Sequence, residues 1–400
     1  MQIIIVSRCT QEFSSSKGGA DALAALHAAA LLTRGHRVTF IARDGWKAPN
    51  AELIGVRTRS VFASNRTAKT ILGQEWYRIN ELLHVLHASI VGAIATNRLG
   101  ADVTISNHYL TNLVMKFISP RTRPIYVLHD SFYSPSSKLG VVDRLPHFLD
   151  LLLGRLGVRF ASTIFCPSQS IRAQLIGIGV PPESIFVIKP PLPKGVDEGC
   201  EFRGLTSNAS SPSDGDSPIH ILSVGQQTGR KRFDLLIEAC KLLSSKVRLH
   251  IVGNGPLHES YVKQIEASTG GAGIDLVASA DDRKLVELYR NSKLFVLASE
   301  KEGWPVTAME AMAQGCPVLL ACNLLLEDVH ESHDELALKI IPLKSTNQLA
   351  SEIDHMLLAT RSVPEAELRR RVYSEAARMY PDLESLGEFI ERRLSGRTSL

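Results

Sequence analysis

Short apolar runs recur along the first half of the chain, separated by longer segments whose apolar residues have helical spacing. Short runs of this kind predict buried strands, and the longer segments predict helices. The predicted strands lie at residues 2–7, 36–43, 102–107, 124–130 and 162–168. Strands that alternate with helices predict a parallel sheet covered on both faces. We therefore expect a doubly wound domain over residues 1–195.

The same alternation restarts after a segment that has almost no residue suited to a core. Residues 203–217, "RGLTSNASSPSDGDS", are dense in Ser, Pro, Gly and Asp, which predicts a linker or flexible loop over 196–217. The strands predicted beyond it lie at residues 219–225, 247–253, 274–279, 293–299 and 316–321. The expected fold class is α/β, with a second doubly wound, Rossmann-like domain over 218–375 that faces the first across a cleft. Ligands of such sheets bind beyond the carboxyl ends of the strands.

Composition narrows the class of protein. The chain has 400 residues, of which 44% are apolar and 22% are charged, as in ordinary soluble globular proteins. Its six cysteines are scattered without a CxxC pattern, so neither a disulfide framework nor a zinc site is predicted. The apolar start ends at Arg8, too early for a secretory signal, and no run approaches the roughly 18 residues that span a bilayer. We expect a cytoplasmic protein.

Charge is unevenly divided between the two halves of the chain. Residues 1–200 hold 22 Lys and Arg against 13 Asp and Glu, a balance of +9, whereas residues 201–400 hold 23 against 28, a balance of −5. A basic amino half suits an acidic partner, either an anionic lipid surface or a phosphate-bearing substrate. Nucleic acid fits less well, because the basic residues are dispersed. A basic face that is merely solvated stays open as an alternative.

Two carboxylates flank a predicted helix start beyond one of the strands. In "SEKEGWPVTAMEAMAQGCPV" (299–318), Glu302 precedes the predicted helix 305–314 and Glu310 lies in its second turn. Backbone N–H groups at a helix start form an anion site, and a glycine there lets a phosphate approach. The residues expected to provide this site are Gly303, Trp304, Val306 and Thr307. Because carboxylates bind hydroxyl groups rather than phosphate, the predicted ligand has a diphosphate between two polyols, as a sugar nucleotide does.

The segment "EGWPVTAMEAMAQGCPV" resembles the signature of the family-four retaining glycosyltransferases, in which two glutamates are separated by seven residues. These enzymes have the glycosyltransferase B fold of two Rossmann-like domains. The resemblance implies that Glu302 binds hydroxyls of the donor sugar and Glu310 the ribose hydroxyls. It also implies that the backbone of 304–307 binds the β-phosphate. A surface helix with an incidental pair of glutamates is the alternative.

A second segment, "ILSVGQQTGRKRFDLLIEA", resembles the family's V-G-R-x-x-x-x-K-G-x-D motif. The resemblance places Gly225 at the nucleotide and Lys231 on the donor phosphates, where it stabilises the leaving group. The chain departs from the family at Gln226, where the usual residue is arginine, so one of two cations is missing. Arg230, or Arg232, is expected to replace it. A solvated turn is the alternative for this cluster.

The amino half carries weaker matches to the same family. "SKGGADALAALHAAALLTRGHRVTFIA" resembles the family's opening, which implies that Gly18 and Gly19 bring backbone amides to the diphosphate; a purely structural turn stays open. His129, in "YVLHD", is expected near the reacting sugar, with a buried core histidine as the alternative. Residues 66–98 are the candidate contact for the acceptor or a membrane, although a plain core helix explains them too. The terminal segment 376–400 resembles the helix that crosses back to the amino domain.

Together with these features, the resemblance implies a retaining hexosyltransferase that moves a sugar from a nucleoside-diphosphate sugar to an acceptor hydroxyl, in polysaccharide, lipopolysaccharide or glycolipid synthesis. No metal and no cofactor are expected, because cations and helix amides serve the diphosphate and no DxD cluster ends a strand. The expected partners are the nucleotide-sugar donor, a glycan or lipid-linked acceptor and an anionic membrane surface, but not nucleic acid. Two other functions stay compatible: a sugar-nucleotide epimerase of the same fold, and a non-catalytic sugar-nucleotide-binding subunit.

Overall fold

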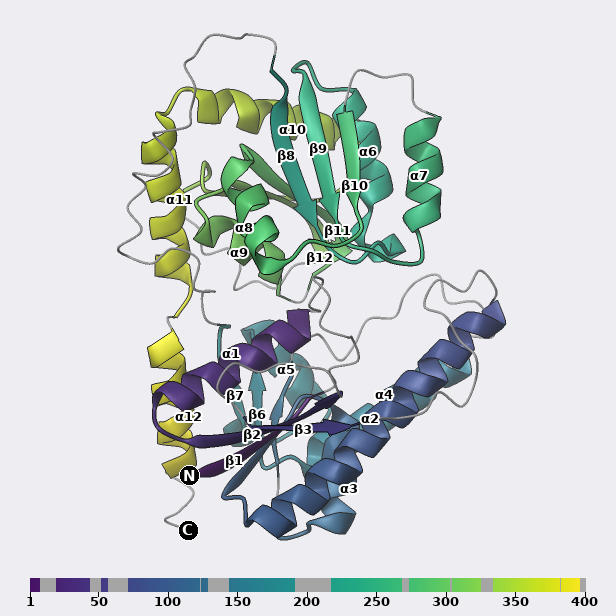
Figure 1. The fold of residues 1–400 in the computed structure, drawn as a ribbon, viewed down its shortest axis with the longest axis vertical. Coiled ribbons are helices and arrows are strands. Elements are labelled where there is room, and N and C mark those ends of the chain that lie inside the picture. Colours follow the sequence, from purple (N-terminus) through teal and green to yellow (C-terminus); the bar gives the residue numbers. More distant parts are fainter. Residues whose placement is uncertain are drawn as a thin grey trace. The chain divides into compact units, whose positions relative to one another are not determined.

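A computed structural model gives the fold of the chain as two compact units (Figure 1). The first comprises mainly Met1–Pro191 and Pro381–Leu400, and the second comprises most of the chain between Leu192 and Tyr380. The residues that the structure describes are 1–7, 19–43, 52–56, 71–122, 124–128, 144–190, 217–267, 273–302, 304–324, 334–381 and 383–395. Nearly all of the predicted linker 196–217 lies outside these residues.

The first unit is built on a parallel sheet with seven described strands. They are β1 (Gln2–Val6), β2 (Arg37–Arg43), β3 (Glu52–Val56), β4 (Val103–Ser106), β5 (Ile125–Val127), β6 (Thr163–Cys166) and β7 (Ile185–Val187), in the spatial order β3-β2-β1-β4-β5-β6-β7. The position of β1 inside the sheet, between β2 and β4, explains the unbroken apolar run Ile3–Val6. Ile3 and Ile5 belong to the core on one face of the sheet, whereas Ile4 and Val6 belong to the core on the other. A strand covered on both faces needs apolar residues at every position.

Helices cover both faces of this sheet (Figure 1). They are α1 (Gly19–Thr33), α2 (Ile71–Leu99), α3 (Tyr109–Ile118), α4 (Arg144–Phe160), α5 (Gln169–Gly177) and α12 (Leu383–Ser395). Leu31 of α1 and Leu386 of α12 share one core, and Ala88 of α2 lies in the other. The last helix of the chain thus packs against the first helix, and an ion pair joins Arg34 to Glu391 beside them.

One described segment of α2, Leu82–Leu99, has the length and mean hydropathy (1.2) of a helix that could cross a membrane. However, 44% of this segment is buried inside the structure, and α2 packs against α3 and β1. The apolar residues of this segment therefore serve at least in part to build the core.

The second unit repeats the architecture with six described parallel strands. They are β8 (Ile219–Val224), β9 (Val247–Val252), β10 (Gly273–Val277), β11 (Leu294–Lys301), β12 (Val318–Leu324) and β13 (Leu338–Ile341), in the order β10-β9-β8-β11-β12-β13. The helices are α6 (Phe233–Lys241), α7 (His258–Glu266), α8 (Asp282–Asn291), α9 (Val306–Ala313), α10 (Thr346–Arg361) and α11 (Glu365–Met379). The chain order reverses between β8 and β11, and ligands of doubly wound sheets bind at the carboxyl end of this switch point.

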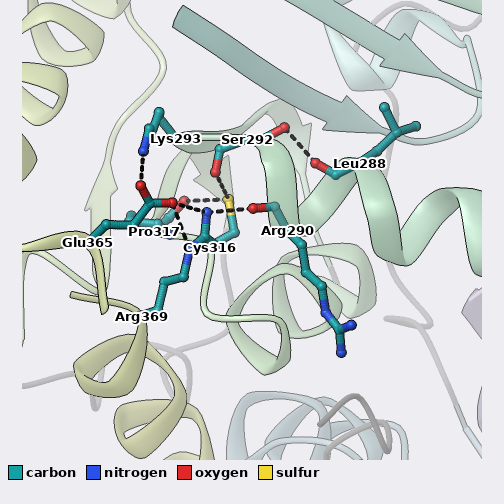
Figure 2. A network of polar contacts seen from close by, with 8 residues as sticks. All are labelled: Leu288, Arg290, Ser292, Lys293, Cys316, Pro317, Glu365 and Arg369. Atoms are coloured by element: carbon teal, nitrogen blue, oxygen red, sulfur yellow. Dashed lines mark hydrogen bonds and ion pairs between the residues drawn. The ribbon is translucent and has the colours of Figure 1, made fainter. Parts of the chain in front are cut away.

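A polar network holds α11 on the second unit (Figure 2). Arg369 is 3% exposed and donates to the Glu365 carboxylate (2.9 Å) and to the carbonyl of Arg290. Lys293 forms a second ion pair with Glu365. The Cys316 thiol beside them donates to backbone carbonyls, and burial raises its pKa to about 12, so it stays protonated. The start of α11 is therefore fixed to the end of α8.

The structure differs from the predicted elements in two respects. The edge strands β3, β7 and β13 were not predicted, because β3 is partly exposed and contains Gly55, and β7 and β13 are only three and four residues long. Of the predicted helix 66–98, residues 71–98 lie in α2, and residues 66–70 lie outside the described residues. The boundary predicted after residue 375 falls inside α11, because the chain leaves the second unit only after Tyr380.

Candidate functional site

A cluster of three charged side chains, two of them buried, lies where β8 and β11 end, at the switch point of the second sheet. The ammonium of Lys231 lies 2.7 Å from Oε1 of Glu302, and the guanidinium of Arg230 lies 3.3 Å from Oε2 of the same carboxylate. Glu302 is only 5% exposed and Lys231 only 8%. Three residues that the sequence proposed separately for the donor site are therefore in contact.

A short turn after β8 carries the two cationic residues, Arg230 and Lys231. The 3₁₀ turn η4 (Gly229–Lys231) follows the strand, and Ser299 of β11 donates its hydroxyl to the carbonyls of Arg230 (3.1 Å) and Lys301 (3.0 Å). Ser299 thereby ties the turn to the strand that carries Glu302. Sequence reasoning assigned no role to this serine, although its position at the end of a predicted strand is a signal that could have found it.

Arg232 takes a different direction from its neighbours. Its φ of 41° lies in the left-handed region, and it ends η4 at the start of α6. Its guanidinium binds Asp234 (2.9 Å) and lies 3.5 Å from Glu300. Of the two arginines that could replace the missing cation at Gln226, Arg230 is the one that contacts Glu302.

The pKa of Glu302 reflects two opposing influences. Burial acts to raise it, but the positive charges of Lys231 and Arg230, with hydrogen bonds from Lys231 and Ser299, outweigh burial and lower it below its usual value. The carboxylate is therefore ionised at neutral pH and holds two cations in place.

Glycine is required where the β8 and β9 loops meet. Gly253 has a φ of +131°, and a Cβ on it would lie 2.1 Å from the carbonyl oxygen of Gly225. A Cβ on Gly255 would lie 2.4 Å from the carbonyl oxygen of Gln227. The fully buried amide of Gln227 joins the same loops, since its Nε2 donates to the carbonyl of Gly253 (2.7 Å) and its Oε1 lies 2.9 Å from Nδ1 of His258. These contacts shape the loop that leads to Lys231.

At the start of the helix after β11, one backbone N–H that was expected to bind phosphate already donates a hydrogen bond within the chain. Pro305 is the residue before α9, and the N–H of Val306 donates to the carbonyl of Trp304 (2.9 Å). A phosphate bound to the Val306 amide would have to replace that bond. Thr307 lies in the first turn, and Gly303 lies outside the described residues.

The Trp304 side chain is part of the core. It is 6% exposed, its indole N–H donates to the sulfur of Met309, and its ring meets Tyr380 edge to face at 5.7 Å. These contacts anchor the start of α9. Any part that Trp304 plays in ligand binding therefore falls to its backbone.

Glu310 lies one turn further along α9 and is half-buried. The hydroxyl of Tyr289, on α8, donates to its Oε2 at 2.9 Å. Sequence reasoning did not single out Tyr289, because a tyrosine in an amphipathic helix resembles any core residue.

The first unit adds little to this site in the described residues. Gly18 and His129 lie outside them, and Gly19 is the first residue of α1. His108 caps α3, with Nδ1 accepting the N–H of Leu110 at 3.1 Å, which is a structural role. Within the described ranges no group of three or more His, Cys, Asp or Glu side chains is placed to hold a metal ion.

Comparison with known families covers both units. Residues 17–194 match the family described as "Glycosyltransferase Family 4", and residues 207–379 match "Glycosyl transferases group 1". Among curated proteins, the D-inositol 3-phosphate glycosyltransferase of Xylanimonas cellulosilytica is 31% identical over 135 residues, which are 30% of this chain and 32% of the relative. The putative colanic acid biosynthesis glycosyltransferase WcaL of Salmonella typhimurium is 28% identical over 197 residues, which are 47% and 43% of the two chains. The chain thus spans less than half the length of these relatives.

Solved structures extend the likeness of fold to the whole chain. HepE of Anabaena in complex with UDP-glucose has a TM-score of 0.67 at 16% identity and covers 99% of this chain and 100% of its own. Sucrose-phosphate synthase of Thermosynechococcus elongatus has a TM-score of 0.73, also at 16% identity, and covers 100% and 99%. With the family matches of both units, this chain belongs to the family-four glycosyltransferases and has the glycosyltransferase B fold.

Proposed function

We propose that the protein is a retaining hexosyltransferase that moves a sugar from a nucleoside-diphosphate sugar to an acceptor hydroxyl. The observation that carries this proposal is the buried ion pair of Lys231 and Glu302, which the more exposed Arg230 joins, at the switch point of the second sheet. Relatives named for colanic acid, amylovoran and lipopolysaccharide synthesis support a role in making polysaccharide, lipopolysaccharide or glycolipid. The UDP-glucose complex of HepE supports a nucleotide-sugar donor.

Donor binding replaces the two cations that contact Glu302 with hydroxyls of the donor sugar. In the structure Glu302 holds the cations of Lys231 and Arg230. A diphosphate carries more negative charge than one carboxylate and offers several acceptor oxygens, so it competes for both cations. Glu302 then turns its oxygens to hydroxyls of the donor sugar. The cations are in place before the leaving group develops its charge, which is the condition for electrostatic stabilisation.

Arg230 supplies the cation that Gln226 lacks. Gln226 is exposed and carries no charge, whereas Arg230 shares a carboxylate with Lys231. Two positive charges therefore reach one place from consecutive residues. We assign Lys231 and Arg230 to the donor phosphates, with Gly225 giving room for the lysine stem, because a Cβ there would lie 3.3 Å from its Cε.

Transfer with retention requires the acceptor to attack from the face that the diphosphate leaves. The departing phosphate oxygen takes the acceptor's proton, and an oxocarbenium-like state connects donor to product. Glu302 serves the hydroxyls and not as a covalent nucleophile, since the family motif that it matches puts this glutamate on peripheral hydroxyls of the donor sugar and not beneath the reacting carbon. Glu310 binds the ribose, Thr307 and its neighbours bind phosphate, and His129 assists near the reacting sugar. The reaction uses no metal or other cofactor.

We assign acceptor binding and membrane contact to the first unit. We assign the acceptor, a glycan or a lipid-linked glycan, to this unit, and we place the protein on the cytoplasmic side of an anionic membrane. Exposed apolar residues on neighbouring helices support a peripheral contact, namely Leu82, Leu86 and Ile94 of α2 and Phe117 of α3, which is 80% exposed. Binding to anionic liposomes that weakens with salt supports this contact, and binding that is absent contradicts it.

A donor screen tests the activity. Wild-type protein is incubated with UDP-, GDP- and ADP-sugars, and thermal stabilisation and release of nucleoside diphosphate are measured with and without acceptor mixtures. A transferase releases diphosphate slowly without acceptor, and faster with the right acceptor, with the sugar's anomeric configuration kept in the product. Free epimerised sugar without acceptor identifies an epimerase instead. Stabilisation without any release of nucleoside diphosphate identifies a binding subunit. If the protein shows neither stabilisation nor release with any of these sugars, the proposed use of these donors is contradicted.

A further inference from the structure

Tyr289 contacts Glu310 from inside the core of the second unit. The tyrosine is 2% exposed, its ring lies 5.8 Å from that of Phe295 on β11, and its hydroxyl donates to Oε2 of Glu310 at 2.9 Å. Burial and the contact with Phe295 restrict the positions that the ring can take. The hydroxyl is therefore a fixed point, while Glu310 is a half-buried side chain with several rotatable bonds.

The direction of this hydrogen bond does not change with pH in the neutral range. Burial, and then the charge of Glu310, raises the pKa of the Tyr289 phenol well above its usual value, so the phenol keeps its proton. An ionised carboxylate only accepts hydrogen bonds. The phenol thus always donates, and it fixes one oxygen of the carboxylate.

Fixing one oxygen limits the directions that the carboxylate can take. A mobile glutamate must lose side-chain freedom when it binds a ligand, and a side chain already held in place loses less. A phenylalanine would fill the same space in the core. What tyrosine adds at this position is the contact with Glu310.

We propose that Tyr289 is a positioning residue that orients Glu310 toward the 2′- and 3′-hydroxyls of the donor's ribose. This inference rests on the proposed function, in which Glu310 binds the ribose. It assigns part of the preference for a ribonucleotide to a side chain that does not touch the ligand.

The test compares ribonucleotides with analogues that lack the ribose hydroxyls. Dissociation constants are measured by calorimetry for UDP, GDP and ADP and for their 2′,3′-dideoxy counterparts, with wild type, Tyr289→Phe, Glu310→Ala and Tyr261→Phe. Tyr261 is a matched control, because its hydroxyl is also buried in the second unit but has no hydrogen-bond partner in the described part of the chain. The ratio of the two constants is internal to each variant, so it does not depend on the fraction of protein that is folded.

In wild type and in Tyr261→Phe we expect the ribonucleotide that binds to be preferred by about tenfold or more, the effect on affinity of one hydrogen bond to a charged group. In Tyr289→Phe we expect the preference to fall by about fivefold, through weaker binding of the ribonucleotide alone. An unchanged preference in Tyr289→Phe, or an equal loss for both ligands, overturns the positioning role. An unchanged preference in Glu310→Ala instead overturns the assignment of Glu310 to the ribose, and with it that part of the proposed function.

Discussion

Lys231 and Glu302 are 71 positions apart in the sequence, yet the lysine ammonium donates to the glutamate carboxylate at 2.7 Å in a nearly closed environment. A buried ion pair of this kind is weak evidence for stability, because the loss of hydration offsets much of the attraction. Its place at the carboxyl end of two strands favours a functional reason. The pair holds the lysine side chain at the place where we propose that the donor diphosphate binds.

Replacing the carboxylate tests this exchange of partners. Glu302→Gln keeps the shape and the hydrogen-bonding oxygen but removes the charge, so Lys231 and Arg230 remain without a counterion. We expect sugar transfer to fall by about 100-fold or more, because the hydroxyls of the donor sugar lose a charged acceptor. We expect the free energy of unfolding to fall by up to about 3 kcal/mol. Activity within a few-fold of wild type, measured on folded protein, contradicts the role of Glu302.

The same pair predicts a dependence of stability on pH. Because the folded pKa of Glu302 is lowered from 4.5, the carboxylate contributes stability above about pH 4.5, and this contribution is lost as the pH falls through the folded pKa. Chemical denaturation of wild type and Glu302→Gln should therefore give a constant difference near neutral pH, which shrinks below about pH 4.5. A difference that grows with acid contradicts the depressed pKa.

Variants of the two neighbouring arginines test which of them replaces the cation that is missing at Gln226. Arg230→Gln removes the charge that lies 3.3 Å from Glu302, whereas Arg232→Gln removes one that binds Asp234. We expect Arg230→Gln to weaken the binding of the preferred nucleoside diphosphate by about tenfold, the effect of one charge-assisted contact at a partly exposed residue. Arg232→Gln should leave binding within about twofold of wild type. Equal losses in calorimetry would mean that neither arginine specifically replaces the cation missing at Gln226.

The close approach of two loops makes a prediction about stability. In Gly253→Ala, a methyl group would meet the Gly225 carbonyl in a backbone conformation that alanine rarely adopts. We expect the free energy of unfolding to fall by about 2 kcal/mol or more, from strain and from displacement of the Gly225 loop. Gly229→Ala is the control, because nothing lies within 4 Å of a Cβ there. Equal stabilities of the two variants in denaturation experiments would contradict the account of this loop.

Much of this site follows from local sequence pattern. The strand before Glu302, the helix after Pro305 and the turn before Lys231 all have short-range signals, and the structure has each of these elements. The strands of both sheets were predicted where they are covered on both faces. The edge strands β3, β7 and β13 were missed because a strand that pairs on one side only does not require a long apolar run.

Contacts between distant residues could not be predicted from pattern. Nothing near Arg230 indicates that it, rather than Arg232, contacts Glu302; the left-handed turn at Arg232 decides it. Tyr289 has the spacing of an ordinary core residue, and only the packing of α8 against α9 brings it to Glu310. The Val306 amide was expected to be open to phosphate, but the backbone at Pro305 turns the Trp304 carbonyl onto it.

The central claim is that Lys231 stabilises a departing nucleoside diphosphate. The most direct measurement is the rate at which diphosphate is released from the preferred nucleotide sugar, at saturating donor, by wild type and by Lys231→Ala. We expect the rate to fall by about 100-fold or more in the variant, the usual effect of removing one group that stabilises developing negative charge. A variant that binds the donor more weakly but releases diphosphate at the wild-type rate once saturated would contradict the claim.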